Sequence, residues 1–318
     1  MVSEFSIENQ TTLEKVTFGQ TIDKSYLYKN DGLDWGTAGA EHSTFSYPGQ
    51  VGSYFSMTAI KERTITIVGY VYYLPSKEDI VNLSRMDIEN KIERVIKNKK
   101  KTLNGLINPN DFVKIKVGDY YIVGKPTQSI KYGNIYEENN EFFCQFLISV
   151  LCNNPMFKKE TITRNVISGS NPKFHFPLVF PNVGIVMSER TEWRMLAIDN
   201  EGDTEVGTRI ILEANGDVLN PTIESLSGGQ SFTINKQMVK GERIIVNTNE
   251  GDEKGIIGYY NGVESNYFQY WDVDNDWVKL PKGYSLFGFT TADGSESNLD
   301  VSIEFNPEKL GLEDMWWY

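Results

Sequence analysis

The stretch SYPGQVGSYFSMTAIKERTITIVGYVYYL, residues 46–74, decides the fold of this chain. A Pro-Gly turn at residues 48–49 and a second glycine, Gly52, precede a long run of β-branched and aromatic residues from 63 to 73. Thr and Ile alternate over residues 64–67, which is the period of a strand with one buried face. Beyond Val68 the alternation with polar residues stops, which indicates that both faces of the strand are covered by other parts of the protein. The stretch therefore predicts a core strand that anchors an antiparallel sheet and is entered through a glycine turn.

The composition bounds the class of protein. The 318 residues suffice for two domains that each bury a core. An aromatic share of 13%, together with 27 glycines, favours sheets and turns over helix bundles. The net charge of −12 argues against the backbone of a nucleic acid as a partner.

The cysteines and histidines suggest no metal or redox chemistry. Cys144 and Cys152 lie in one apolar run without a CxxC motif, so we predict free, buried thiols. The two histidines are far apart in the sequence, and neither has a motif around it. We predict no metal site and no cofactor.

The amino-terminal residues MVSEFSIENQ are polar and acidic, and they lack the basic and apolar segments of a signal peptide. No apolar run approaches the ~20 residues that a membrane helix needs. We therefore expect synthesis in a cytoplasm without a signal peptide, and no membrane insertion.

The first predicted domain, residues 1–157, is β-sandwich-like with one helix at about 77–104. Ser76 is expected to cap this helix, with Asp79 as its capping-box partner. Lysines at 97 and 99–101 gather at the carboxyl end, where the helix dipole favours cations; binding of nucleic acid is the weaker alternative. The apolar stripe of the helix comprises Ile80, Leu83, Ile88, Ile92, Val95 and Ile96.

Strands surround this helix in the sequence. A hairpin is predicted from residues 112–117 and 120–124, with Gly118-Asp119 as its turn. The apolar run 141–152 is predicted to be the central strand that closes the domain.

The second predicted domain, residues 158–318, follows a charged and threonine-rich segment and a turn-rich one at 168–172. Short strands separated by polar turns predict a β-sandwich. The strands are expected at 208–213, 232–235, 242–247, 284–290 and 299–305.

Residues 267–277 combine aromatic and acidic side chains. Carboxylates at 272, 274 and 276 resemble the start of a calcium loop, but Trp277 replaces the glycine that such a loop needs, so a solvated hairpin tip is the main interpretation. Aromatic residues beside carboxylates also suit a sugar-binding face, whereas the alternative is that they fill the sandwich core. The possible glycan-facing residues are Tyr267, Tyr270, Trp271, Asp274 and Trp277.

No pattern indicates catalysis. No spacing singles out two of the 43 acidic residues as a hydrolytic pair. The Gly228-Gly229 pair lacks the Lys-Ser/Thr of a phosphate-binding loop. We expect that the protein is not an enzyme.

The order of the motifs resembles that of the distal tail proteins of long-tailed bacteriophages, a phage tail family. The resemblance covers nearly the whole chain. It is carried by PGQVG at 48–52, RTITIVG at 63–69, CNNPMF at 152–157, NGD at 215–217, NPTI at 220–223, GERIIV at 241–246 and WVKLPKG at 277–283.

This resemblance implies a structural protein of the virion, at the distal end or baseplate of a phage or phage-derived tail. The first domain would form a hexameric ring (the belt). The second would be a galectin-like or carbohydrate-binding-module-like sandwich. The ring would join the tail tube protein to the tail-tip hub protein, with the tape measure and receptor-binding proteins as further partners in host attachment. The alternative function is a carbohydrate-binding protein that recognises host cell-wall glycans through the second domain, and a glycan-cleaving tail enzyme ranks last.

A cyclic ring needs two different complementary surfaces on each subunit. We expect one in residues 34–55 and the other on the flank of the helix. The candidate ring-interface residues are Trp35, His42, Phe45, Tyr47, Gln50 and Tyr54.

Overall fold

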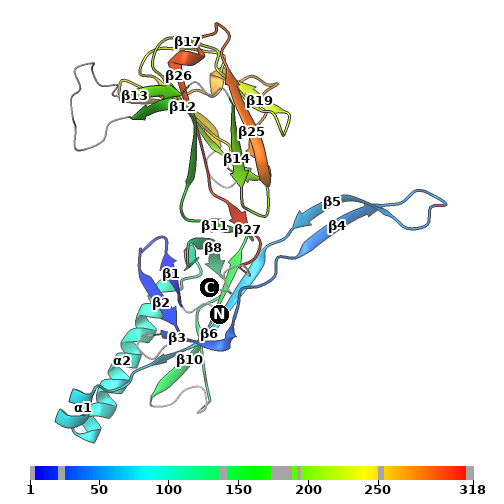
Figure 1. Ribbon diagram of the computed structural model, residues 1–318. Helices are drawn as coiled ribbons and strands as arrows, with labels where there is room; N and C mark the ends of the chain where they lie inside the picture. Colours follow the sequence, from blue (N-terminus) through cyan, green and yellow to red (C-terminus); the bar gives the residue numbers. More distant parts are fainter. Residues whose placement is uncertain are drawn as a thin grey trace, which may run out of the picture. The chain divides into compact units, whose positions relative to one another are not determined.

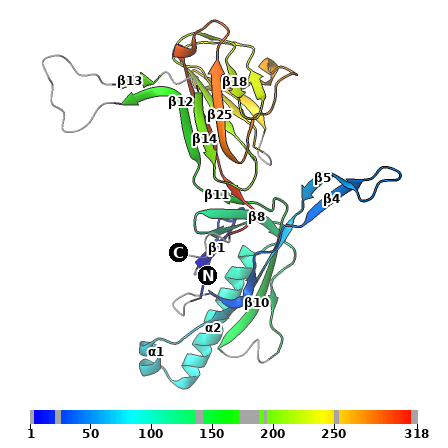
Figure 2. The same cartoon turned by 45° about the vertical axis from the view of Figure 1, so that its right-hand side comes forward.

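A computed structural model describes residues 4–20, 26–135, 142–172, 188–191, 195–249 and 254–312. The chain forms two compact units (Figures 1 and 2). Unit 1 comprises Met1–Glu160 and Leu310–Tyr318, and unit 2 comprises Thr161–Lys309. Each unit has its own hydrophobic core.

Unit 1 is a β-barrel covered by a helix. Its strands follow the order β11-β8-β7-β1-β2-β3-β6-β10-β9, and a further pairing between β8 and β10 closes the run from β8 to β10 into a barrel. A separate two-stranded sheet, β4–β5, extends from this barrel. The strands are β1 (Glu4–Asn9), β2 (Lys15–Gly19), β3 (Tyr26–Asp34), β4 (Ala40–Phe45), β5 (Tyr54–Ile60), β6 (Arg63–Tyr72), β7 (Val113–Val117), β8 (Tyr120–Pro126), β9 (Lys131–Tyr132), β10 (Phe143–Cys152) and β11 (Phe157–Lys159).

Strands β6 and β10, which correspond to the strands predicted at 63–73 and 141–152, are neighbours in this barrel, whereas the prediction for the domain was a sandwich-like sheet. They pair along their whole length, with Ile67 opposite Ile148. In both strands buried residues alternate with partly buried ones, because one face lies in the core and the other is partly covered. A Cβ atom at Gly69 would lie 2.3 Å from the Leu27 carbonyl oxygen and 2.6 Å from the Phe146 ring. The glycine in the central strand therefore makes room for a core aromatic ring.

The predicted single helix is wrong in one respect: it is two helices, α1 (Lys77–Asn82) and α2 (Arg85–Leu106). Ser76 and Asp79 form the predicted capping box of α1. The chain is extended at Leu83, and the Ser84 hydroxyl then accepts a hydrogen bond from the backbone N–H of Asp87, which begins a new helix. The side chains that α2 buries are Ile92, Ile96, Leu103 and Leu106.

The two cysteines, Cys144 and Cys152, are free and buried, as predicted. Burial raises the pKa of the Cys152 thiol to about 12. This thiol is therefore protonated and unreactive at neutral pH.

The carboxyl-terminal segment returns to unit 1. Leu312 is buried in the core of unit 1, and the backbone oxygen of Leu310 accepts a hydrogen bond from the guanidinium of Arg63. From the sequence alone this segment belongs with the second domain, because no local signal marks its return.

Unit 2 consists of antiparallel sheets around a second core. A seven-stranded sheet has the order β13-β12-β26-β16-β21-β22-β23, and a four-stranded sheet has the order β14-β25-β18-β19. The pairs β15–β24 and β17–β20 add two short ribbons. The elements are β12 (Thr163–Pro172), β13 (Ser188–Thr191), β14 (Met195–Asn200), β15 (Val206–Gly207), β16 (Arg209–Ala214), β17 (Val218–Leu219), β18 (Thr222–Ser225), β19 (Gln230–Thr233), β20 (Gln237–Met238), β21 (Arg243–Asn247), β22 (Gly255–Tyr260), β23 (Val263–Asn266), η1 (Phe268–Tyr270), β24 (Lys279–Leu280), β25 (Gly283–Thr290), η2 (Glu296–Asn298), β26 (Leu299–Phe305) and β27 (Glu308–Lys309).

The mainly β class predicted from the sequence is confirmed in both units. Four of the five strands predicted in the second domain correspond to β16, β21, β25 and β26, and the strand predicted at 232–235 overlaps β19 at residues 232–233 only. Among the residues that the structure describes, no helix is long and apolar enough to cross a membrane.

Candidate interaction surfaces

The β4–β5 hairpin is the most exposed part of unit 1. Every residue of both strands is exposed, and the hairpin projects from the barrel (Figures 1 and 2). Gly49 and Gly52, in the turn at its tip, have φ angles of 85° and 89°. The glycine turn of the motif PGQVG therefore reverses the chain at the end of an arm, and β5 lies between this turn and the central strand β6.

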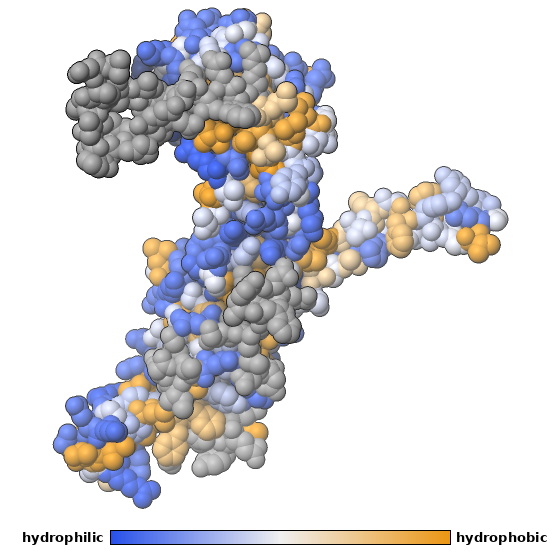
Figure 3. Space-filling view, viewed as in Figure 1, coloured by the Kyte–Doolittle hydropathy of each residue, from blue (hydrophilic) through white to orange (hydrophobic). Residues whose placement is uncertain are grey.

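The arm carries apolar side chains along its length (Figure 3). Its register shifts between Ser43 and Thr44, which brings the Phe55 ring to 5.2 Å from the His42 ring. Near the tip the rings of Phe45 and Tyr54 are 5.6 Å apart. The exposed large apolar side chains are Phe45, Tyr47, Val51, Tyr54, Phe55, Met57 and Ile60. Such an exposed series is typical of a surface that binds another protein.

Five of the six candidate ring-interface residues lie in the arm. His42, Phe45 and Tyr54 are on its strands. Tyr47 and Gln50 are in its turn, where the Gln50 side chain accepts a hydrogen bond from the backbone N–H of Tyr47.

Trp35 lies outside this group and packs against the barrel core. Its ring centroid is 5.8 Å from that of Phe5 and 6.0 Å from that of Phe157.

A second exposed apolar group lies at α1, at the end of unit 1 opposite the arm (Figures 1–3). It comprises Leu74, Ile80, Val81 and Met86, and we call it the α1 patch. Ile80 is 64% exposed although it belongs to the predicted apolar stripe, because the helix break turns α1 away from the core.

An ionic network fixes α1 in place. The carboxylate of Asp79 accepts hydrogen bonds from Lys91 Nζ, from the Tyr73 hydroxyl at 2.7 Å and from the backbone N–H of Ser76 at 3.1 Å. The hydrogen bond from Lys91, followed by those from Tyr73 and Ser76, holds the pKa of the Asp79 carboxyl well below its ordinary value. Ile80 and Val81 of the α1 patch thus lie on a helix whose first turn is tied to α2 and to the chain after β6.

In unit 2, the candidate glycan-facing aromatics are in contact with one another and with the core. The Trp271 ring lies 5.2 Å from that of Phe232 and 4.7 Å from that of Trp277, and Phe268 stacks on Trp277 at 6.4 Å. Phe268 is 53% exposed, whereas the two tryptophans are partly buried. We call Phe268, Trp271 and Trp277 the aromatic row.

Tyr267 and Tyr270 are not part of the aromatic row. They pack against the core, with ring centroids 5.2 Å apart. Burial, followed by a hydrogen bond to Glu242, raises the pKa of Tyr267 to about 12. Asp274 is exposed at the tip of the loop.

The other two acidic residues of this loop stabilise its turn. The Asp272 carboxylate accepts a hydrogen bond from Asn235 at 3.2 Å, and that of Asp276 accepts one from the backbone N–H of Ser231 at 3.3 Å. Within the described part of the chain, no group of three or more His, Cys, Asp or Glu side chains is placed to hold a metal ion.

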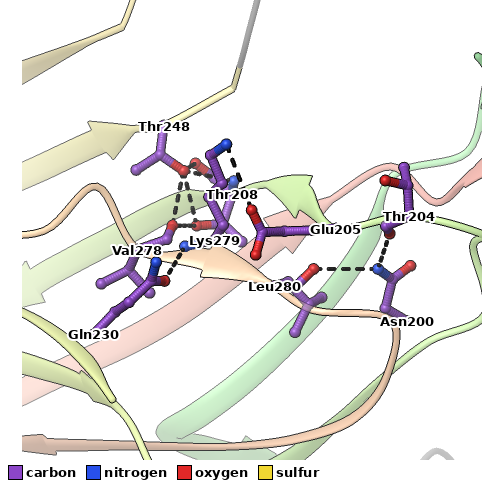
Figure 4. Close-up of polar contacts among 9 residues, drawn as sticks. All are labelled: Asn200, Thr204, Glu205, Thr208, Gln230, Thr248, Val278, Lys279 and Leu280. Atoms are coloured by element: carbon purple, nitrogen blue, oxygen red, sulfur yellow. Dashed lines mark hydrogen bonds and ion pairs between the residues drawn. The ribbon is translucent and has the colours of Figure 1, made fainter. Parts of the chain in front are cut away.

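A buried polar network positions the strand that follows the aromatic row (Figure 4). The hydroxyls of Thr208 and Thr248 donate to the backbone oxygen of Val278 at 3.1 and 2.9 Å. Gln230 accepts a hydrogen bond from the backbone N–H of Lys279 at 3.0 Å, and the Asn200 amide donates to the Leu280 oxygen at 3.3 Å. Because Val278 directly follows Trp277, this network also positions Trp277 of the aromatic row.

No protein-family model matches the chain, and no curated protein matches its sequence. Among solved structures, the chain is similar to the Dit protein of phage SPP1, described as a paradigm of the hub adsorption apparatus in phages that infect Gram-positive bacteria. The identity is 12%, the TM-score is 0.57, and the match covers 96% of this chain and 98% of that one. A chain of the phage P2 baseplate, in its activated conformation with Ca, matches at 11% identity over 96% and 98% of the two chains, with a TM-score of 0.42. The chain thus has the fold of the phage distal tail protein Dit over nearly its full length, as the sequence motifs predicted.

Proposed function

We propose that this chain is a structural component of the baseplate or tail tip of a phage or phage-derived tail. In this role it forms a hexameric ring that joins the tail tube to the tip hub and to receptor-binding proteins. The fold shared with SPP1 Dit supports the proposal. The proposal gives the chain no catalytic role.

The observation that carries the ring is the pair of exposed apolar surfaces at opposite ends of unit 1. A ring closes through heterologous contacts, in which one surface of each subunit binds a different surface of the next. The arm supplies one such surface, and the α1 patch supplies a candidate for the other. The arm residues proposed for the interface are His42, Phe45, Tyr47, Gln50 and Tyr54, whereas Trp35 would act by supporting the barrel beside the arm.

The first test is the mass of the purified protein, measured by light scattering behind a sizing column. The expected mass is about six times the 36.2 kDa of one chain. A protein that remains monomeric at every concentration, and also with tail tube protein present, contradicts the ring.

Two variants then test the surfaces separately. Phe55→Ser with Met57→Ser alters the arm, and Ile80→Ser with Val81→Ser alters the α1 patch. Each variant alone is expected to be monomeric. An equimolar mixture retains one intact pair of surfaces, so it is expected to form dimers and nothing larger. Val273→Ser, at a position that is 97% exposed in unit 2, is the control and is expected to leave the ring intact. Larger assemblies in the mixture would contradict a head-to-tail contact between the arm and the α1 patch.

The second candidate function is carbohydrate recognition by unit 2 as a galectin-like or carbohydrate-binding-module-like sandwich. Two antiparallel sheets around a common core support this classification, and the partly exposed aromatic row supports recognition of a glycan. A sugar that stacks on this row is expected to change the tryptophan fluorescence. Titration with soluble cell-wall glycan fragments tests this, and a response that Phe268→Ala leaves unchanged would contradict binding at the row.

A further inference from the structure

The second half of α2 carries a group of cations that none of the surfaces described above includes (Figure 1). Residues 94–110 contain five basic residues and no acidic one, namely Arg94, Lys97, Lys99, Lys100 and Lys101. The helix dipole favours cations within the last turn of a helix. Since α2 continues to Leu106 and has no basic residue in its last turn, the dipole does not account for these positions.

Three of the five cations form a stripe on the outer side of the helix. Arg94, Lys97 and Lys101 are exposed, and they follow one another at spacings of three and four residues. Residues at these spacings lie on the same face of a helix. This face is opposite the side of α2 that is buried in the core of unit 1. We call these three residues the basic stripe.

The other two lysines are part of the packing of the helix. Lys99 Nζ donates a hydrogen bond to the backbone oxygen of Tyr72 at 2.6 Å and lies 5.9 Å from the centre of the Tyr26 ring. Lys100 Nζ lies 5.1 Å from the centre of the Tyr132 ring. These contacts hold the second half of α2 in place, so the basic stripe is presented on a fixed helix.

The two halves of α2 differ in how their charges are matched. In the first half, Arg85 forms an ion pair with Glu89 at 3.0 Å, and Lys91 forms one with Asp79. Among the described residues, the members of the basic stripe form no ion pair. The same helix therefore carries matched charges at its start and unmatched cations further on.

The basic stripe destabilises the helix that carries it. Like charges three or four positions apart on a helix repel each other, and Arg94 with Lys97 and Lys97 with Lys101 are two such pairs. The carboxylate of Glu14 lies near Gly105, about one helical turn beyond the stripe. Contact with an acidic partner would offset this repulsion.

The surroundings of the stripe favour an acidic protein over other anions. The apolar side of α2 lies in the core, so the helix cannot insert it into a lipid surface. Residues 85–106 contain no aromatic side chain on which bases could stack. The net charge of −12 also repels a nucleic acid at long range. The stripe spans about 10 Å along the helix, which matches two turns of a partner helix.

We propose that the basic stripe binds an acidic helical segment of a partner protein, whose Asp or Glu side chains recur every three or four residues. The stripe belongs neither to the arm nor to the α1 patch. The inference therefore goes beyond the proposed function, and it does not depend on whether the ring forms.

Fluorescence anisotropy with the full chain tests the proposal. The probe is a labelled, alanine-rich peptide with a glutamate at every fourth position, and the control peptide has lysine in place of glutamate. Only the acidic peptide is expected to bind, and more weakly as the salt concentration rises. Lys97→Gln with Lys101→Gln should weaken the binding about fivefold, the effect of losing two exposed ion pairs. Lys15→Gln with Lys125→Gln removes the same charge from exposed positions of the barrel and should leave the affinity unchanged.

Lys97→Glu tests whether the stripe destabilises the helix. The new carboxylate lies three residues after Arg94 and four before Lys101, which are favourable spacings for ion pairs. The thermal unfolding midpoint is therefore expected to rise while the acidic peptide no longer binds. A lower midpoint would contradict the claim that repulsion within the stripe costs stability.

Three binding results would overturn the proposal. The first is that the acidic peptide does not bind even at low salt. The second is an equal loss of binding in the two double variants, which would show that only the net charge matters. The third is a single-stranded DNA oligonucleotide that binds more tightly than the peptide and loses its binding in Lys97→Gln with Lys101→Gln, which would assign the stripe to nucleic acid. The mass of the protein in solution reports separately on the ring.

Discussion

Strands β5 and β6 follow each other with only Lys61 and Glu62 between them, yet their surroundings differ completely. Both are rich in β-branched, aromatic or other apolar residues. In β6 every second residue is buried and all but one of the others are partly buried, whereas all of β5 is exposed. The difference arises from pairing: β6 lies between β3 and β10 in a closed barrel, whereas β4 is the one partner of β5 among the described strands. An apolar strand is therefore a core element only where the topology supplies cover, and otherwise it is a candidate binding surface.

Among substitutions that test this difference between β5 and β6, the largest loss of stability is expected at Gly69 in β6. Gly69→Ala places a methyl group against the Leu27 carbonyl and the Phe146 ring, so the strand or the ring must move. We expect the free energy of unfolding of unit 1 to fall by about 3 kcal/mol or more. Chemical denaturation measures it. An equally stable variant would show that the barrel adapts at this point.

A matched pair of truncations compares the two strands directly. Ile67→Ala removes a side chain that is 0% exposed, and a loss of about 3 kcal/mol in unfolding free energy is expected. Phe55→Ala removes one that is 72% exposed, and a change within about 0.5 kcal/mol is expected for the monomer. The effects on assembly, measured by size-exclusion chromatography, should have the reverse order: Phe55→Ala should weaken the ring more than Ile67→Ala. Equal effects of both on monomer stability would contradict the distinction.

Two basic residues at the junction give a smaller contrast. Arg63 is 3% exposed, donates to Leu310 and lies over the Phe157 ring, whereas Lys61 forms an exposed ion pair with Glu41. Arg63→Gln is expected to cost about 2 kcal/mol, because a buried carbonyl loses its charged donor. Lys61→Gln should leave the thermal unfolding midpoint unchanged. A stable Arg63→Gln variant would mean that Leu310 finds another donor.

The smallest effect is the acid sensitivity of the barrel surface. Hydrogen bonds from Lys114 and then Lys116 lower the pKa of Glu160 from 4.5 to about 2. A carboxyl group whose pKa is lowered by folding stabilises the folded state at any pH above its ordinary, unfolded-state pKa. This stabilisation is lost as the pH falls through the folded-state pKa. Thermal midpoints should therefore fall between pH 4.5 and about 2. Lys114→Gln with Lys116→Gln should reduce this pH dependence, and an unchanged profile in that variant would contradict the assignment.

The sequence predicts those parts of the fold that depend on neighbouring residues. The alternation at Ile65 and Ile67 identified β6, and the Gly118-Asp119 turn identified the β7–β8 hairpin. The arm could not be predicted, because Phe55 and Met57 are as apolar as core residues and exposure is a property of the topology. The helix break at Leu83 was hidden by an apolar stripe that continues across it.

The other features that the sequence does not predict depend on contacts between distant segments of the chain. Barrel closure by β8 and β10, and the hydrogen bond from Arg63 to Leu310, join parts of the chain that carry no mutual signal. The same holds for the candidate sites. The aromatic row lies within a short stretch and could be recognised there. By contrast, Glu213, Arg243 and Tyr259 lie side by side on three strands of unit 2, and only the strand register reveals this.

The return of the chain at Leu310 has a consequence for biosynthesis. Leu312 completes the core of unit 1, but the ribosome reaches it only after the whole of unit 2 has been translated. At roughly 5–20 residues per second, the intervening segment takes about 7–30 s to synthesise. During that interval the barrel exists without its last core residue, and Arg63 lacks its Leu310 acceptor. Unit 1 therefore reaches its final stability only once Leu312 has been translated, after unit 2 has had time to fold.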